Sequence, residues 1–241
     1  MKNFKLMAIV ALIAMSLGLT ACNSGGDDDN KMYYSNVVTY EGSAGGMITF
    51  SFQEMNDSQP ITFRAQGSMP ADVLIGQRVY VSFTTPSTGL TEGMVVSLTQ
   101  CASIPNVKAS LTDPVPSNWQ DISSIYLQTM FRSGKWINMA ALVPYNLEAR
   151  INPKFVIDPA TVNNDYPEAY MYFENLGTGA STGSVNSATL IATYDISEVW
   201  NLSTCLGLKI HINNTNSSVN GGSSQGCEIS ADGKLFTIKK Q

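Results

Sequence analysis

The chain has 241 residues, with 14 Lys and Arg against 19 Asp and Glu and a single histidine. This length suffices for one large domain or two small ones. Basic residues are scattered, and only Lys239 and Lys240 are adjacent. This acidic balance argues against nucleic-acid binding, where neutralised phosphates supply most of the affinity.

Residues 1–21 have the pattern of a lipoprotein signal peptide. Lysines at positions 2 and 5 precede the apolar run LMAIVALIAMSLGL at 6–19. This run is too short for a helix that spans a hydrocarbon core of ~30 Å, which needs about 20 residues. The next residues, Leu-Thr-Ala21-Cys22, resemble a bacterial lipobox. We therefore predict cleavage between Ala21 and Cys22 and acylation of Cys22, for example by palmitate; the alternative is a plain signal peptide followed by an incidental cysteine.

Residues 22–31 form a predicted flexible, acidic tether, because two glycines and three aspartates cannot pack into a core. Ser24, Asp27, Asp28 and Asp29 lie in the stretch SGGDDD, which resembles the export signal of surface lipoproteins in Bacteroidetes. That resemblance implies a lipid-anchored protein on the outer membrane, facing the cell exterior. The alternative is that the acids only keep the tether extended. Without residues 1–21 the chain has 12 Lys and Arg against 19 Asp and Glu, a net charge of −7.

Residues 32–104 have the period-two alternation of a small β-barrel. In GQRVYVSFT, the apolar residues from Val79 to Phe83 alternate with Arg78, Tyr80 and Ser82, which predicts one buried and one solvated face. The expected strands lie near 34–41, 46–54, 61–66, 77–85 and 93–103. Five short strands fit an OB-like barrel, with an SH3-like barrel as the nearest alternative.

Three prolines in PNVKASLTDPVPSNWQ predict a linker at 105–120. Strand patterns then resume over 121–241, near 123–131, 134–143, 149–157, 168–176, 187–197, 206–213 and 226–239. The last range contains Asp232-Gly233, a hairpin signal. The sequence therefore predicts an all-β chain with an antiparallel β-sandwich after the barrel. Two long polar loops, 176–187 and 213–226, interrupt the sandwich.

Cys101, Cys205 and Cys227 remain besides the lipobox cysteine. An envelope protein can form disulfides, and Cys205 with Cys227 is the first choice because the bond would close the polar segment 213–226. Three buried, reduced thiols are the alternative.

We find no catalytic, cofactor or metal motif in the sequence. His211 alternates with apolar neighbours and is expected on the wetter face of its strand beside Lys209, so we do not expect a His-dependent catalytic device. One histidine and widely spaced cysteines lack the ligand spacing of zinc sites. Glycosidases need two facing carboxyl groups; the four local carboxylates are expected at solvated positions, and these are Glu168, Glu174, Asp195 and Glu198.

Aromatic residues are the candidates for ligand binding. Tyr170 and Tyr172 share one face of a predicted strand, where they form either a stacking surface for sugars or part of the core. Trp136 is a third candidate.

The chain after its signal peptide resembles the NigD-like lipoproteins of Bacteroidetes. The order of features is similar: lipobox and acidic tether, GQRVYVSFT, a Pro-containing linker, DISSIYLQTMFRSGKWINMAAL, then ATYDISEVW and LGLKIHIN. The resemblance implies an N-terminal OB-type domain and a C-terminal β-sandwich. It also implies an association with bacteriocin immunity, but no functional residues.

We therefore expect a surface-exposed, non-enzymatic binding or accessory protein, for a polysaccharide or for an outer-membrane partner. The alternatives are protection against a bacteriocin and a structural role in the envelope or fimbriae. The expected anchor is the lipid on Cys22, and no cofactor is expected.

Overall fold

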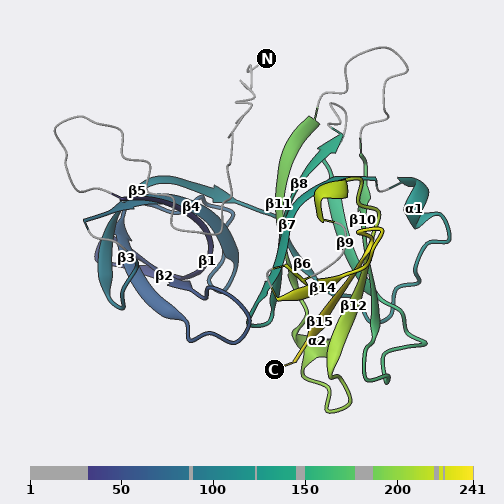
Figure 1. Ribbon diagram of the computed structural model, residues 1–241. Helices are drawn as coiled ribbons and strands as arrows, with labels where there is room; N and C mark the ends of the chain where they lie inside the picture. Colours follow the sequence, from purple (N-terminus) through teal and green to yellow (C-terminus); the bar gives the residue numbers. More distant parts are fainter. Residues whose placement is uncertain are drawn as a thin grey trace.

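The computed structural model describes residues 32–240, apart from 87–88, 123, 145–149, 177–186, 220–222 and 225. The signal peptide and tether lie outside the described residues, as do Ala21, Cys22, Ser24, Asp27, Asp28 and Asp29. The described chain forms a five-stranded barrel followed by a sandwich of two sheets (Figure 1). The predicted all-β fold class is confirmed.

The barrel contains β1 (Met32–Ala44), β2 (Met47–Phe52), β3 (Ile61–Gln66), β4 (Arg78–Thr85) and β5 (Met94–Ser103). It closes in the order β1-β2-β3-β5-β4, and β3 and β5 run parallel. Phe63 packs between Phe50 and Phe83 inside it, with ring centroids 5.4 and 5.2 Å away. The five strands expected from the alternation are all present, because the alternating apolar residues fill this interior.

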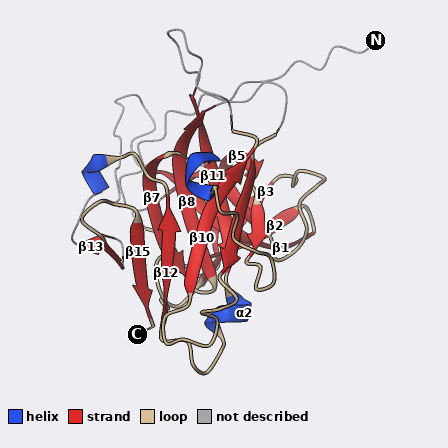
Figure 2. Cartoon of the chain, turned by 90° about the vertical axis from the view of Figure 1, so that its right-hand side faces the viewer, coloured by secondary structure: helices blue, strands red, loops and turns tan. Residues whose placement is uncertain are grey.

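In its described residues, the sandwich contains ten strands and three short helical turns. The strands are β6 (Asn106–Lys108), β7 (Tyr126–Ser133), β8 (Trp136–Pro144), β9 (Asn152–Ile157), β10 (Glu168–Glu174), β11 (Ser187–Asp195), β12 (Gly207–Ile212), β13 (Ser223–Ser224), β14 (Cys227–Ile229) and β15 (Leu235–Lys239). The helical turns are α1 (Trp119–Ile122), α2 (Ser197–Trp200) and the 3₁₀ turn η1 (Ser217–Val219). One sheet has the order β13-β14-β15-β12-β10-β9 and the other β6-β11-β8-β7. Figure 2 shows β15, β12 and β10 of the first sheet side by side.

The sequence predicts an antiparallel sandwich, but two of the strand pairs in the structure are parallel. β10 pairs with β12 in parallel, and so does β6 with β11. The chain passes from β10 through β11 in the other sheet before it returns as β12, and it therefore re-enters beside β10 in the same direction. The hairpin expected at Asp232-Gly233 is confirmed between β14 and β15, with a φ of +68° at Gly233.

The outer face of β4 is buried, although the alternation predicted a solvated face. Arg78 and Tyr80 are only 2% and 5% exposed. The reason is that the sandwich covers this face of the barrel: the Arg78 guanidinium donates to Ser133 Oγ at 3.3 Å and to Asn138 Oδ1 at 3.1 Å. Burial lowers the pKa of Arg78 to about 10. No carboxylate contacts it among the described residues, so Arg78 is a buried cation with neutral partners.

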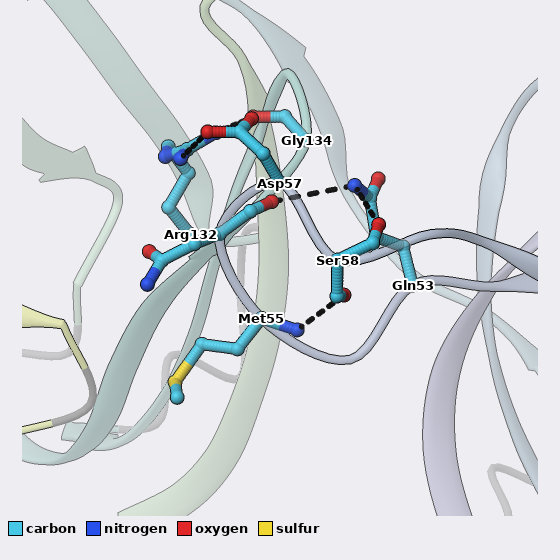
Figure 3. Close-up of polar contacts among 7 residues, drawn as sticks. Gln53, Met55, Asp57, Ser58, Arg132 and Gly134 are labelled. Carbon is cyan, nitrogen blue, oxygen red and sulfur yellow. Dashed lines mark hydrogen bonds and ion pairs between the residues drawn. The ribbon is translucent and has the colours of Figure 1, made fainter. Parts of the chain in front are cut away.

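A second junction joins the β2–β3 loop of the barrel to the β7–β8 hairpin (Figure 3). Arg132 donates to both carboxylate oxygens of Asp57, at 2.8 and 2.7 Å, and to the carbonyl of Gly134 at 2.8 Å. The Asn56 N–H donates to the Arg132 carbonyl, and the Gly134 N–H donates to the Asn56 carbonyl, both at 2.7 Å. The Arg132 guanidinium also lies 4.6 Å from the ring of Trp200. Side chains and backbone thus join the barrel and the sandwich at one point.

The predicted Pro-containing linker, 105–120, also pairs with strands of the sandwich. Its residues 106–108 form β6 and pair with β11. Ser110 then exchanges backbone hydrogen bonds with β9, to the Phe155 carbonyl at 2.9 Å and from the Ile157 N–H at 2.8 Å. Proline cannot donate to a strand ladder, but the residues between the prolines still pair with the edges of both sheets.

Two asparagines at the start of the polar tract pair with another strand edge. Asn214 Oδ1 accepts from the Leu127 N–H at 3.0 Å, and Asn216 Nδ2 donates to the Leu127 carbonyl at 2.6 Å. Both asparagines are buried. Their amides replace a neighbouring strand and satisfy the exposed edge of β7.

Candidate functional site

The candidate site lies on the outer face of the six-stranded sheet, where β10 and β12 run side by side. Glu168 is paired with Lys209 and Tyr170 with His211. The alternate residues of both strands are buried between the two sheets. His211 and Lys209 are therefore on the more solvated face, as the alternation predicted.

Three rings form a row across this face. Tyr170 stacks on His211 with centroids 4.6 Å apart and planes 10° apart, and Trp119 meets Tyr170 edge to face at 5.4 Å. Glu168 Oε2 lies 3.3 Å from His211 Nε2 and 3.4 Å from the Tyr170 hydroxyl. Burial and the neighbouring carboxylates Glu168 and Asp158 raise the pKa of Tyr170, which keeps its hydroxyl protonated as a donor.

Helix α1 positions Trp119 over the sheet. The Trp119 N–H donates to the Pro116 carbonyl at 3.1 Å, and Asn213 Nδ2 donates to the Gln120 carbonyl at 2.6 Å. Figure 1 shows α1 beside β10, on the side of the sandwich away from the barrel. The indole of Trp119, in the Pro-rich segment, thus lies on the outer face of the sheet, against β10.

Two hollows flank Trp119. The first, which we call the His211 hollow, has a volume of about 310 Å³ and is bordered by the polar residues Gln120, His211, Asn213, Ser230, Asp232 and Lys234. The second, the Pro116 hollow, has a volume of about 520 Å³ and is bordered by Thr112, Pro114, Pro116, Asp158, Pro159 and Tyr170. Both hollows are open to solvent, so a ligand in either would keep part of its surface exposed.

Tyr172 does not form a stacking surface with Tyr170. It is 6% exposed and packs with Trp119, Val156 and Val115. The two tyrosines share a face, as predicted, but the segment 115–119 covers Tyr172 and leaves Tyr170 partly exposed.

Trp136, the third aromatic candidate, lies at the start of β8 in the other sheet, with Lys135 Nζ 4.9 Å from its ring centroid. No ring contact joins it to Tyr170 within the described part of the chain. Trp119 was missed as a site residue, although a tryptophan in a proline-rich segment was the available signal.

The predicted Cys205–Cys227 disulfide is wrong for this structure, in which Cys101, Cys205 and Cys227 are free. The Cys205 thiol lies 3.2 Å from the Gly207 carbonyl, whereas the Cys227 thiol points to the Met130 carbonyl at 3.9 Å. The two thiols thus occupy separate places in the core. Burial raises the pKa of Cys227 to about 12 and also raises that of Cys205.

The four carboxylates considered for hydrolysis each have their own partner, and the two that share a strand, Glu168 and Glu174, lie at opposite ends of β10. Glu168 contacts His211, Glu174 contacts Lys154, Asp195 contacts Lys135 and Glu198 contacts Lys108. Within the described ranges, no cluster of three or more His, Cys, Asp or Glu side chains could bind a metal ion. Among the same residues, no helix has the length and apolar character needed to cross a membrane.

No protein-family model matches the sequence, and no curated protein matches it. Solved structures do match. A protein of unknown function from Bacteroides vulgatus is 12% identical, with a TM-score of 0.58 over 86% of this chain and 90% of that chain. A candidate lipoprotein from Bacteroides fragilis is 12% identical, with a TM-score of 0.54 over 87% and 99%. A NigD-like immunity protein from Bacteroides caccae is 12% identical, with a TM-score of 0.50 over 85% and 90%.

These likenesses extend over most of this chain and of each matched chain, and at such low identity they show a common fold. They confirm the fold that the resemblance to the NigD-like lipoproteins implied. The chain therefore shares its two-part, all-β fold with Bacteroides proteins that include a NigD-like immunity protein.

Proposed function

We propose that the chain is a lipid-anchored, surface-exposed, non-enzymatic protein that binds an extracellular glycan at the Trp119–Tyr170 surface. The observation that supports this most is the row of three rings beside two hollows, one with a mainly polar border and one with a mixed border that includes three prolines. Sugars offer apolar C–H faces beside hydroxyl groups. Aromatic rings next to carboxylate, amide and hydroxyl groups complement both.

The distribution of partners around the site supports binding rather than catalysis. Glu168 is bonded to both His211 and Tyr170, so its carboxylate holds the rings in place. A glycosidase would place a second carboxyl group opposite it, roughly 5 to 10 Å away across the bond to be cleaved. The next carboxylate along β10, Glu174, contacts Lys154 and Asn152 at the other end of the strand.

The expected anchor places this surface outside the cell. Acyl chains on Cys22 contribute ~0.8 kcal/mol per buried CH₂ group. The tether of residues 22–31 reaches at most roughly 35 Å when fully extended, at about 3.5 Å per residue. The barrel would then stay near the membrane, and the candidate site on the far side of the sandwich would face away from the barrel.

Native affinity electrophoresis tests the proposal. Residues 31–241, which include every described strand, are run through gels that contain plant, host or microbial polysaccharides. We expect one polysaccharide to retard the protein, and we expect Tyr170→Ala to remove the retardation. Trp136→Ala is the matched control, because it removes a partly exposed aromatic from the other sheet.

Two results would count against the proposal. One is free migration through every gel. The other is equal loss of retardation in Trp136→Ala and Tyr170→Ala, when circular dichroism shows both variants folded. A second site variant, Lys234→Ala, guards against misfolding, because Lys234 is exposed and borders the His211 hollow.

Bacteriocin protection is the alternative from the sequence. One of the similar structures has the name of an immunity protein, at 12% identity and a TM-score of 0.50. That likeness concerns the fold, and the described residues offer no contact that favours protection over glycan binding. Cross-linking on intact cells would detect the protein partner that this alternative requires.

A further inference from the structure

Trp119 borders both hollows, so a ligand that fills one hollow meets the same indole as a ligand in the other. The indole is fixed in this position. Tyr170 contacts it edge to face at 5.4 Å, and the Asn213 amide holds the adjoining Gln120 carbonyl at 2.6 Å. Trp119 is only 9% exposed, and the part that stays uncovered borders both hollows.

The two spaces differ in chemistry. The border of the His211 hollow consists mainly of amide, hydroxyl and charged groups, with Asn213, Asp232 and Lys234 among them. The Pro116 hollow has three prolines and Val115 beside Thr112 and Asp158. One space therefore suits a sugar ring through its hydroxyl groups, and the other suits a ring through its C–H face.

The charges at the site favour an uncharged ligand. Asp158 borders one hollow and Asp232 the other, and Glu168 lies with His211 and Tyr170. Hydrogen bonds from Ser230 and the Lys234 N–H hold the pKa of Asp232 below its ordinary value, so this carboxylate is ionised at neutral pH. Lys234 provides the one ammonium group among the described border residues. An acidic sugar would meet more like charge than opposite charge.

We infer that the site takes an uncharged oligosaccharide chain that lies across Trp119, with one sugar unit in each hollow. This inference rests on the proposed glycan binding and adds to it the length and charge class of the ligand. A single sugar could fill only one of the two spaces.

The test uses fragments of the polysaccharide that retards the protein. Its free monosaccharide and its fragments of increasing length compete with the gel-bound polysaccharide for residues 31–241. We expect fragments of two or more units to compete about tenfold better than the monosaccharide, because they can occupy both hollows. This difference in affinity corresponds to ~1.4 kcal/mol.

Three exposed positions in one segment provide matched variants. Ser117→Trp fills the Pro116 hollow and Gln120→Trp fills the His211 hollow, whereas Asn118 borders neither. We expect both filling variants to weaken binding of the longer fragments about tenfold. We expect Asn118→Trp to bind like the wild type.

The outcomes separate this inference from the proposed function. If a polysaccharide retards the protein but its monosaccharide competes as well as the fragments, the inference fails and glycan binding stands. It also fails if only one filling variant weakens binding, or if only uronic acid polysaccharides cause retardation. If no polysaccharide retards the protein, both fail together.

Discussion

Asp57 of the barrel and Arg132 of the sandwich form a bidentate ion pair, with N–O distances of 2.8 and 2.7 Å. The Arg132 side chain is fully buried, while the Asp57 side chain is 58% exposed. The pair therefore supplies a buried cation with its counter-charge from the other part of the molecule. We expect the barrel and sandwich to unfold as one unit for this reason.

Asp57→Ala removes that counter-charge and leaves Arg132 buried without a carboxylate. We expect a loss of about 2 kcal/mol in the free energy of unfolding, below the ~3–5 kcal/mol of fully buried pairs because water reaches Asp57. Urea denaturation measures it. Glu228→Ala is the control: its ion pair with Lys239 is exposed on both sides, and its loss should cost less than about 1 kcal/mol. Equal effects of the two substitutions would contradict the importance of the junction.

The same pair predicts a pH dependence. Hydrogen bonds from Arg132 hold the pKa of Asp57 below its ordinary value of 3.8. A folded-state pKa below the unfolded one gives stability that is present above 3.8 and is lost as the pH falls through the folded value. Compared with Asp57→Asn, the wild type should therefore be more stable near neutral pH, and the difference should shrink in acid. A difference that stays constant from about pH 7 to about pH 2.5 would oppose this assignment.

Arg78→Lys tests the buried cation on β4. The guanidinium donates to four acceptors at once, and these are Thr39 Oγ1, the Val37 carbonyl, Ser133 Oγ and Asn138 Oδ1. An ammonium group cannot reach all of them, so buried acceptors lose partners, at a cost of about 2 kcal/mol. Arg64→Lys on the exposed face of β3 is the matched control and should change thermal unfolding little. If Arg78→Lys matched this control, the four bonds would not matter for stability.

Gly134→Ala tests the backbone of the junction. Gly134 has a φ of +55°, and a methyl group there would lie 2.3 Å from Gln53 Oε1. Gln53 cannot move freely, because its amide donates to the carbonyls of Asn56 and Ser58. Gly45 has a similar φ of +60° and no atom within 4 Å of its added methyl group. Both alanine variants should lose about 1 kcal/mol from backbone strain, and Gly134→Ala should lose about 1 kcal/mol more. Chemical denaturation of both would reveal equal losses if the junction were loose.

The cysteines provide a prediction about redox state. Residues 31–241 contain Cys101, Cys205 and Cys227, all of which are free in the structure. Alkylation in denaturant without a reductant should modify all three, as mass spectrometry would show. In the folded protein the partly exposed Cys101 should react first, since the other two thiols are buried. Only one modified cysteine in denaturant would indicate a disulfide instead.

The sequence predicted the strands well because their alternation directly reflects the burial of one face. The same logic failed at β4: Arg78 and Tyr80 are polar enough for a solvated face, yet a second domain covers them. Period-two alternation reports the core of one sheet and contains no information on contacts between domains. Arg132, whose partner Asp57 is far away in the sequence, was missed for the same reason.

The candidate site was predicted only in part. His211 was placed on the correct strand face, because strand geometry fixes where alternate residues point, whereas Tyr170 was left open between a stacking surface and the core. Tyr172 was expected to be exposed or buried together with Tyr170, but residues 115–119 cover Tyr172 alone. Trp119 and Val115 cover Tyr172 by packing on the outer face of β10. This contact joins residues far apart in the sequence, and local patterns do not predict it.

Hydrogen exchange of residues 31–241, with and without the retarding polysaccharide, tests whether the glycan binds at the Trp119–Tyr170 surface. We predict slower exchange on binding in the segments 112–120, 209–213 and 230–235, which border the two hollows. The barrel strands and the β7–β8 hairpin with Trp136 should exchange as before. Slower exchange confined to the barrel or to that hairpin would place the glycan elsewhere and contradict the account.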